Sequence, residues 1–336
     1  MRSVLPIRRL SASLRRARER SDLPESRLRL VHEPTLKALQ EIAGARLQLE
    51  ETGAAAAAPA VRALRRLEQR LGRPLRIAVI GEFNSGKSTL ANLLVRIESL
   101  PTAVISNTCI PTLLYHAPAP ELFAVNHRRQ RQRLRVSSPA LRSHDVFRLE
   151  VGLPAARLRA IEILDMPGLA DSRLEDPAAD LSRHAVDIAL WCTLCTQAWK
   201  ESERAAWGDV LPRMRRRGVL VATHRDLLAT ADVEKLLDRL HDEAGPSFRD
   251  ILPMSTLEAL TVARADHAGE AGAVWKTSGA DALETALDDL IHRVRGERLD
   301  AALRVTARVA GRALSRIARP APRGATARRG TLPTVS

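Results

Sequence analysis

The 336-residue sequence is poor in cysteine, in aromatic residues and in lysine. Three cysteines are too few for a disulfide framework, which points to a reducing compartment, with the cytoplasm as the default. Two of them, Cys192 and Cys195, form a C-x-x-C in a run typical of a buried strand, where positions three apart face opposite ways. A redox or zinc site is therefore not expected there. With aromatics at 3%, the core must rely on Leu, Val, Ile and Ala.

Long hydrophobic runs are also missing. No stretch of about 18 apolar residues occurs, so the sequence predicts no membrane-spanning helix. The N-terminus lacks the apolar segment of a secretory signal. Residues 1–20 share an Arg- and Ser-rich, acid-poor composition with organellar transit peptides, but the Arg and Ala bias of the whole chain makes that resemblance uninformative.

The positive charge is unevenly distributed. The whole chain carries a formal net charge of +14, of which residues 1–75 contribute +8 and residues 301–336 another +8, while residues 76–300 carry −2. The basic charge therefore belongs to the flanks. Chemistry that depends on the fold is expected in the middle.

Residues 81–88 read GEFNSGKS, between the apolar run that ends at Ile80 and a helical pattern that begins at Thr89. This arrangement is typical of a phosphate-binding loop, because consecutive backbone N–H groups and a helix N-terminus converge on a triphosphate. Lys87 is expected to reach the β and γ phosphates, and the Ser88 hydroxyl to bind Mg²⁺. The chain has five lysines against 48 arginines, which makes a lysine at this position informative. The expected nucleotide-binding residues of this segment are Gly81, Asn84, Ser85, Gly86, Lys87, Ser88 and Thr89.

From about residue 75, short apolar runs alternate with helical patterns. Six runs, near residues 77, 112, 160, 187, 218 and 250, have the length and composition of buried strands. The pattern predicts an α/β fold of the P-loop NTPase (GTPase) type, with a doubly wound, mostly parallel sheet and flanking N- and C-terminal helices. Ligands of such a sheet bind at the carboxyl ends of its strands.

Two further motifs are expected to sense the third phosphate. Asp165 and Gly168, in LDMPGL, close a strand with a carboxylate placed to hold Mg²⁺ and a glycine whose N–H can meet the γ-phosphate. Thr108, in LPTAVISNTCIPT, could complete the metal shell from a loop that orders when this phosphate is present. The expected metal ligands are thus Ser88, Thr108 and Asp165, and the expected catalytic residues are Lys87, Ser88, Thr108 and Gly168.

A third group of residues is expected to read the base. Thr223, His224 and Asp226, in VATHRD, follow a strand at a position where an aspartate can accept both N1–H and the exocyclic N–H of guanine. Adenine offers no such pair of donors. Ser255 is placed for a backbone contact to the guanine oxygen.

Four segments resemble the GTPase domain of bacterial dynamin-like proteins: GEFNSGKSTL, LPTAVISNTCIPT, LDMPGL and DIALWCTLCTQAWKESE. The resemblance covers residues 70–295, and it implies binding and hydrolysis of GTP to GDP with Mg²⁺, dimerisation across the nucleotide and action at a membrane. The implied organisation is a basic helical segment at 1–74, a dynamin-like GTPase domain at 75–295, a basic helix at 296–319 that packs with the N-terminal helices, and a disordered tail at 320–336.

The chain departs from this family in two respects. His224 stands where the family has a lysine whose stem lies along the base, which leaves the strictness of guanine selectivity open. Only about 40 residues follow residue 295, too few for the long helical stalk with a membrane-binding tip that full-length members carry. A second dynamin-like chain is therefore an alternative to a homodimer partner.

The catalytic water also lacks an expected partner. After the glycine of LDMPGL comes Leu169, where many switch GTPases have a glutamine that orients the attacking water, and Phe83 cannot replace it. We therefore expect slow intrinsic hydrolysis, with water placed by the Thr108 backbone and a charge neutraliser supplied when two GTPase faces meet. Asn84 and Ser85 are the nearest polar candidates for that second role.

The basic flanks admit two interpretations. Arginines recur every four residues at 304, 308, 312 and 316, which places them in one stripe along a helix beside an apolar face. Such a helix can attach to an anionic membrane, or its apolar face can pack against the N-terminal helices and leave a solvated stripe. The arginines of residues 127–136 are expected on one face of an exposed strand. RNA phosphates are an alternative contact there, although no aromatic platform accompanies them.

The leading hypothesis is a cytoplasmic, Mg²⁺-dependent, dynamin-like GTPase that forms homodimers through its GTPase face and touches the inner face of the cell membrane peripherally. One alternative is a GTP-dependent switch on a ribosomal or RNA partner, and another is a nucleotide clamp that does not hydrolyse. RNA has less support than a membrane, and no DNA partner is expected.

Overall fold

The computed structural model describes residues 25–96, 110–134, 145–169, 176–263 and 269–318. The chain divides into two units. The first, the P-loop unit, has its described residues within 74–295, apart from Glu25. The described residues of the second, the helical unit, are 26–73 and 296–318.

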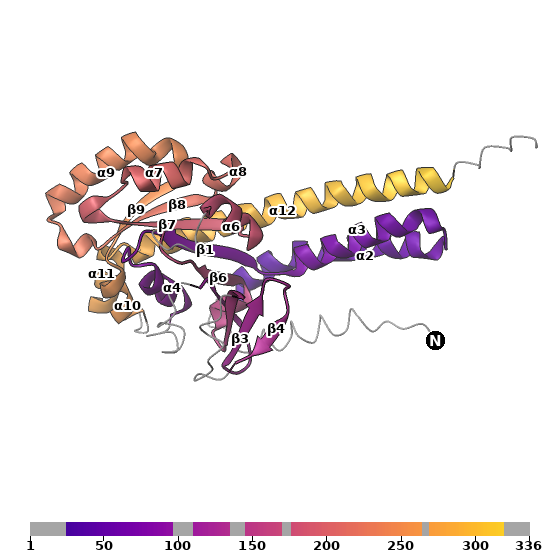
Figure 1. Cartoon of the computed structure of the whole chain (residues 1–336), viewed down its shortest axis with the longest axis horizontal. Coiled ribbons are helices and arrows are strands. Elements are labelled where there is room, and N and C mark those ends of the chain that lie inside the picture. Colours follow the sequence, from indigo (N-terminus) through magenta and orange to yellow (C-terminus); the bar gives the residue numbers. More distant parts are fainter. Residues whose placement is uncertain (1–24, 97–109, 135–144, 170–175, 264–268, 319–336) are drawn as a thin grey trace, which may run out of the picture. The chain divides into compact units, whose positions relative to one another are not determined.

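The P-loop unit is built on a nine-stranded sheet with the order β4-β3-β5-β2-β6-β1-β7-β8-β9. Strands β6, β1, β7, β8 and β9 are parallel, whereas β2 runs antiparallel to β6 and begins a mixed half with β5, β3 and β4 (Figure 1). The strands are β1 Leu75–Gly81, β2 Thr112–His116, β3 Glu121–Asn126, β4 Arg131–Arg133, β5 Val146–Leu153, β6 Ile161–Asp165, β7 Ile188–Leu194, β8 Gly218–Thr223 and β9 Asp250–Met254. The predicted α/β class is confirmed.

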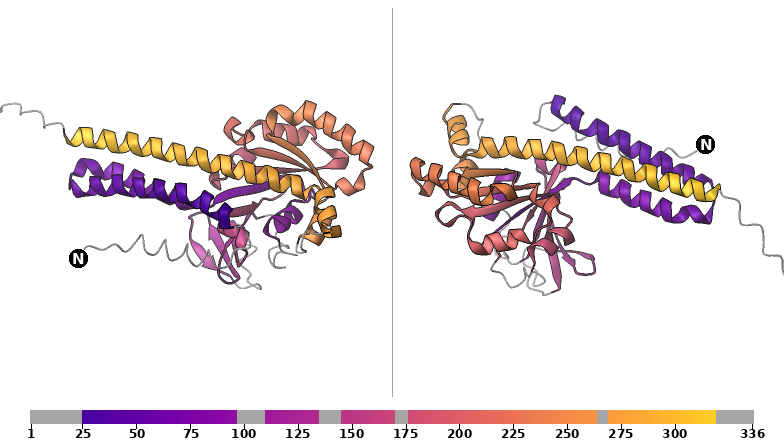
Figure 2. Two further views of the ribbon diagram at one scale, coloured as in Figure 1. Left: turned by 180° about the vertical axis from the view of Figure 1, so that it is seen from behind. Right: turned by 90° about the horizontal axis from the view of Figure 1, so that it is seen from above.

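Helices cover both faces of this sheet (Figure 2). One core joins the sheet to α4, α10, α11 and the first part of α12, and a second core joins it to α6, α7, α8 and α9. The helices are α4 Lys87–Val95, α6 Pro177–Arg183, α7 Glu201–Gly208, α8 Pro212–Arg215, α9 Thr230–Ala244, α10 Thr256–Val262, α11 Gly269–Thr277 and α12 Ala280–Ile317. Short 3-10 turns are η3 Ala156–Arg159, η4 Cys195–Gln197, η5 Arg225–Leu227 and η6 Gly245–Ser247.

The central strand β1 shows why the sheet needs two covered faces. Every residue of β1 is buried. Because successive side chains of a strand point to opposite faces, Ile77 and Val79 enter one core and Ala78 and Ile80 the other. A continuous apolar run is thus the pattern of a strand covered on both sides, as predicted.

The two cysteines of the C-x-x-C lie on different elements, since Cys192 is in β7 and Cys195 begins η4, so only the first lies on the predicted strand. Cys192 lies in the first core and Cys195 in the second, and both thiols are free and buried. Burial raises the pKa of each thiol to about 12, so neither forms a thiolate near neutral pH. The expectation of two structural thiols agrees with this geometry.

The helical unit consists of α2 Glu25–Glu51, η1 Ala55–Ala57, α3 Ala58–Gly72 and the second part of α12. Its core is small and rich in alanine, and Ile42, Leu49 and Leu64 are its largest fully buried side chains. Gly53 has a φ of 62°, which ends the first helix, and Pro59 lies in the first turn of α3, where its missing N–H removes no helix bond. Within the described part of the chain, every helix is either too short or too polar to cross a bilayer.

The arginine-rich stretch 127–136 is only partly the strand that its alternation predicts. Residues 127 and 128 form a turn, Arg129 has a φ of 64°, and only Arg131–Arg133 form strand β4 at the edge of the sheet. Arg131 lies over the Phe123 ring at 4.0 Å and pairs with Glu150 at 2.7 Å, which accounts for one of the arginines through contacts within the unit. Position 135 lies outside the described residues.

Candidate functional site

The loop between β1 and α4, residues 81–88, has the backbone that its glycines predict. Gly86 has a φ of 80° and precedes α4, and its lack of a side chain means that no N-cap side chain bonds to the first N–H groups of this helix. A Cβ on Gly81 would lie 2.1 Å from the carbonyl oxygen of Cys192, which excludes any other residue there. Asn84 also adopts a positive φ, of 61°. The loop is therefore folded as an anion-binding turn at a helix N-terminus.

Lys87 and Ser88 point into this loop from the first turn of α4. The Lys87 ammonium donates to the carbonyl oxygen of Glu82 at 2.5 Å, and the Ser88 hydroxyl donates to Oδ2 of Asp165 at 2.7 Å. Burial lowers the pKa of Lys87, against the opposing effects of Cys192, Asp165 and Glu82. A buried ammonium satisfied by one carbonyl is a strong attractor for an anion.

Asp165, at the end of β6, is the most perturbed carboxyl group of the site. Burial raises its pKa to about 6, although Ser88 and Lys87 both favour the charged form. Its Oδ1 is buried and has no hydrogen-bond partner. A hydroxyl and a half-satisfied carboxylate suit Mg²⁺, which is held by one or two protein oxygens together with phosphates and water. No cluster of three His, Cys, Asp or Glu occurs among the described residues.

The segment after β6 packs directly on the phosphate loop. Leu169 donates its N–H to the carbonyl oxygen of Gly81 at 3.2 Å, and a Cβ on Gly168 would lie 3.0 Å from the backbone N of Phe83. Only glycine fits at 168 without a shift in the loop. The side chain of Leu169 packs against the second core, so it does not face the site. Thr108 lies outside the described residues.

Thr223 joins the phosphate loop to the next strands. Its hydroxyl lies 2.9 Å from the carbonyl oxygen of Ser85 and 3.2 Å from that of Thr193, and the side chain is fully buried. His224 has a φ of 59°, and its Nδ1 lies 3.0 Å from the Thr223 hydroxyl. A Cβ on Gly86 would be 3.4 Å from the His224 ring, which therefore lies against the loop.

Asp226, in η5, is held by Ser255 at the end of β9. The Ser255 hydroxyl donates to Oδ1 of Asp226 at 2.8 Å, and the Ser255 backbone N–H donates to the carbonyl oxygen of Ser278 at 2.8 Å. The second carboxylate oxygen of Asp226 has no side-chain hydrogen bond among the residues that the structure describes. The sequence predicted Ser255 as a backbone contact to a base. In the structure its side chain orients the aspartate.

One part of the site was not predicted from the sequence. Glu82, inside the phosphate loop, accepts hydrogen bonds from Lys200 at 2.8 Å and from Ser202 at 2.6 Å. Burial opposes the charge, but these two bonds hold the pKa of Glu82 below its usual value. Lys200 is the N-cap residue of α7, and its backbone N–H donates to the Glu203 carboxylate. The signal that could have identified this contact is the scarcity of lysine. Of the five lysines in the chain, Lys87 and Lys200 both donate to Glu82 in the structure.

The buried carboxylate of Glu203 holds the segment that carries Lys200 in place. Glu203 accepts from the Trp191 indole at 3.1 Å, from the Thr193 hydroxyl at 2.8 Å and from the Lys200 backbone N–H at 3.0 Å. Burial raises the pKa of Glu203, and the three donors oppose this effect. The end of β7 and the start of α7 are thereby fixed beside the phosphate loop.

Residues 77–224 match a family described as "Dynamin family". Among curated proteins, the chain is similar to Dynamin-like protein 2 of Campylobacter jejuni, with 27% identity over 58% of this chain and 33% of that protein. It is also similar to the Isoniazid-induced protein IniC of Mycobacterium tuberculosis strain H37Rv, with 32% identity over 72% of this chain and 55% of that protein. The chain thus spans between a third and about half of the length of these relatives.

Two solved structures share the fold. Both are described as an oligomerised bacterial dynamin pair that provides a mechanism for the long-range sensing and tethering of membranes. They cover 84% of this chain with TM-scores of 0.57 and 0.56, at 17% and 16% sequence identity. The matched region is 46% of the first of those chains and 55% of the second. At this identity the likeness concerns the fold alone.

Proposed function

We propose that this chain, which matches the dynamin family over residues 77–224, binds GTP together with Mg²⁺ and hydrolyses it to GDP. The observation that carries the proposal is the hydrogen bond of 2.7 Å between Ser88 and the buried carboxylate of Asp165, beside the Lys87 ammonium. A hydroxyl, a carboxylate and a lysine at one glycine loop are the set that phosphoryl transfer needs.

Different residues of the site are proposed to bind the phosphates and the Mg²⁺. The backbone N–H groups at the start of α4 and the Lys87 ammonium hold the phosphates, and binding would draw Lys87 away from the Glu82 carbonyl. Ser88 and Asp165 would hold Mg²⁺, which supplies neutralisation of developing charge on the phosphate oxygens. Gly168 lies against the loop at Phe83, and its N–H is the group expected to meet the third phosphate.

Guanine recognition rests on Asp226. Ser255 occupies one of its oxygens, so the carboxylate is oriented before a ligand arrives, and N–H donors of a guanine can meet the other oxygen. His224 lies beside Gly86 and offers a ring, in place of a lysine stem, to the base or ribose. Removing Asp226 is expected to reduce the preference for GTP over ATP.

Hydrolysis is proposed to depend on a second copy of the chain. Leu169 is packed away from the site, so no side chain at this position orients water. Three large apolar side chains that follow β1, β8 and β9, in the phosphate loop, in η5 and at the start of α10, are exposed, which suits a protein partner on this face. They are Phe83 at 62%, Leu227 at 62% and Leu257 at 69% exposure. Asn84 and Ser85 are candidates for the group that completes the partner's site.

The test is the turnover of GTP per molecule as a function of protein concentration. Wild type should rise with concentration, and Leu257→Ser should flatten the rise without changing the nucleotide affinity. Leu211→Ser is the matched control, because Leu211 is 53% exposed and precedes α8, away from this face. A specific rate that is independent of concentration in wild type would exclude the dimer.

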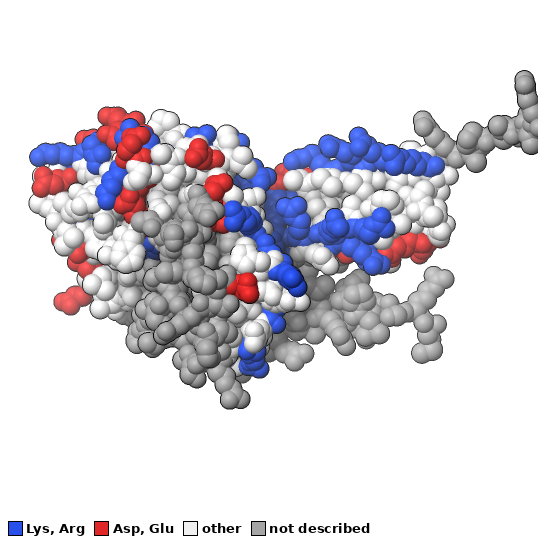
Figure 3. Space-filling model, in the orientation of Figure 1, with Lys and Arg blue, Asp and Glu red and all other residues white. Residues whose placement is uncertain are grey.

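Membrane attachment is a further part of the proposal, carried by the helical unit. Arg304, Arg308, Arg312 and Arg316 are exposed on α12, and basic side chains gather over α12 and α3 in Figure 3. The apolar side of this part of α12, including Leu303 and Val309, packs in the core of the helical unit. Attachment would therefore be electrostatic and would not involve insertion of this face.

The experiment for this part is co-sedimentation with anionic vesicles, with and without a non-hydrolysable GTP analogue. Binding that falls steeply with salt supports an electrostatic attachment. No binding in either nucleotide state would remove the membrane from the proposal. A nucleotide-dependent shift onto ribosomes in the same sedimentation format would favour the switch on an RNA partner instead.

A further inference from the structure

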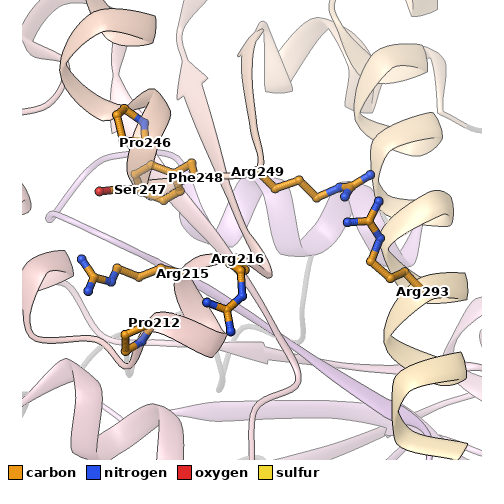
Figure 4. A pocket seen from close by; sticks show the side chains of 8 residues that line it. All are labelled: Pro212, Arg215, Arg216, Pro246, Ser247, Phe248, Arg249 and Arg293. Carbon is orange, nitrogen blue, oxygen red and sulfur yellow. The ribbon is translucent and has the colours of Figure 1, made fainter. Parts of the chain in front are cut away.

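A hollow of the P-loop unit lies at the amino ends of β8 and β9 (Figure 4). Its volume is about 430 Å³. Eight residues line it: Pro212, Arg215, Arg216, Pro246, Ser247, Phe248, Arg249 and Arg293. We call it the arginine pocket.

The arginine pocket is separate from the phosphate loop. Arg249 donates its backbone N–H to the carbonyl oxygen of Gly218, the first residue of β8, whereas Thr223, the last residue of that strand, contacts the phosphate loop. A strand of this length spans about 20 Å. A ligand in the arginine pocket would therefore occupy the opposite edge of the sheet from the proposed nucleotide.

The arginines of this pocket outnumber the acidic side chains that pair with them. Arg249 lies 3.2 Å from Asp250, but neither the Nε nor the Oδ2 that face each other forms a hydrogen bond. Arg215, Arg216 and Arg293 have no ion pair or side-chain hydrogen bond among the described residues. Figure 4 shows the guanidinium groups of Arg249 and Arg293 pointing toward one another. Like charges placed in this way repel unless an anion lies between them.

The wall opposite the arginines is rigid and preformed. Phe248 is buried and stacks on Trp207, with ring centroids 4.6 Å apart and an interplanar angle of 5°. The Trp207 indole donates to the carbonyl oxygen of Ser247 at 3.0 Å, which fixes the chain beside the ring. Pro246 lies on this side, whereas Pro212 lies beside Arg215 and Arg216 (Figure 4). A preformed cavity loses little conformational freedom when a ligand enters.

We propose that the arginine pocket is a binding site for a compact, phosphate-bearing polyanion. Guanidinium groups bind phosphate oxygens through paired N–H donors, which the facing side chains of Arg249 and Arg293 offer (Figure 4), and the four lining arginines with Asp250 give a local formal charge of +3. A soluble diphosphate group and the phosphomonoester headgroup of a lipid share this chemistry. The two sources are separated by the experiment.

The pocket variant is Arg216→Gln with Arg293→Gln. Both side chains are exposed and unpaired in the described structure, so their replacement should not disturb folding. The control is Arg213→Gln with Lys235→Gln, which removes the same charge from α8 and α9 outside the pocket. All chains carry Lys87→Ala, so that the phosphate loop does not contribute to binding. Circular dichroism checks that each chain is folded.

One arm titrates inorganic pyrophosphate by calorimetry, and the other measures co-sedimentation with phosphatidylcholine vesicles that contain phosphatidic acid. In at least one arm, the pocket variant should bind about tenfold more weakly than its parent, and the control within about twofold of it. Loss in the pyrophosphate arm identifies a soluble ligand, and loss in the vesicle arm alone identifies a headgroup. Equal weakening by both double variants, or no binding of either probe, overturns the proposal whether or not GTP is bound elsewhere.

Discussion

The P-loop unit and the helical unit use buried surface in different ways. The P-loop unit has two large cores around a sheet, and burial shifts the pKa values of Asp165, Lys87 and Glu203 beside the phosphate loop. The helical unit has one alanine-rich core, and its charged groups pair with each other, as Arg46 does with Glu68 at 2.8 Å. Ionisable groups with shifted pKa values therefore lie where the core is large enough to remove them from water. The helical unit contributes a basic surface.

The largest effect should come from the single lysine of the phosphate loop. Lys87→Ala removes the buried cation of the site and should lower GTP turnover by about a hundredfold or more. Turnover of radiolabelled GTP measures the loss. If wild type does not exceed this variant, the chain is a nucleotide clamp that does not hydrolyse, and the P-loop unit's chemistry is limited to binding.

The next effect should be confined to the helical unit. Leu64 is fully buried in its core, and Leu64→Ala should lower the free energy of unfolding of this unit by about 2–5 kcal/mol. Leu47→Ala is the control, since Leu47 is 51% exposed. Urea unfolding followed by circular dichroism gives the change. If the nucleotide affinity fell with the stability, the separation between the two units would be wrong.

A pH dependence should be specific to the P-loop unit. Burial and the nearby arginines lower the pKa of His184 to about 3, and its Nδ1 is buried without a hydrogen bond. Between pH 6.5 and 3 the unfolded chain binds a proton that the folded chain does not. The free energy of unfolding therefore falls as the pH falls, by up to about 1.4 kcal/mol per pH unit from this group.

His184→Leu should remove this part of the slope, because the ring stacks on Phe147 and has no bond at Nδ1 to lose. The measurement is urea unfolding at several pH values between 4 and 6.5. His241→Leu, at an exposed site on α9, is the control and should keep the slope of wild type. Identical slopes in the wild type and in His184→Leu would show that His184 is not kept neutral by the fold.

The smallest effect should appear on the basic surface of the helical unit. Arg312→Gln should weaken binding to phosphatidylserine vesicles by about fivefold, since each arginine near an anionic surface contributes about 1 kcal/mol. Arg213→Gln, which removes a charge from the P-loop unit, should have a smaller effect. Co-sedimentation at low salt measures both. An equal loss would assign the attraction to net charge and not to the helical unit.

Much of the P-loop unit follows from the sequence. Continuous apolar runs identified β1, β2, β6, β7, β8 and β9, because strands covered on both faces need no polar positions. Strands β3 and β5 were missed, since the strands of this mixed half of the sheet combine polar with apolar residues, as in Val146–Leu153. The phosphate loop could be predicted from Gly81 and Gly86, because their backbone angles and close contacts admit few other residues.

Contacts between distant segments could not be predicted. The bond from Ser255 to Asp226 and those from Lys200 and Ser202 to Glu82 join residues that only the sheet brings together. A sequence shows which residue types are present but not which loops meet. The arginine pocket is of the same kind, since its lining comes from α8, the segment before β9 and α12.

The most direct test of this account is the affinity of the full chain for GTP and for ATP in the presence of Mg²⁺. Binding of GTP should be at least about tenfold tighter than that of ATP, because guanine alone offers two N–H donors to a carboxylate. Asp226→Ala should bring the two affinities close together. Equal affinities in the wild type would contradict the assignment of the carboxyl edge of the sheet as a guanine-nucleotide site.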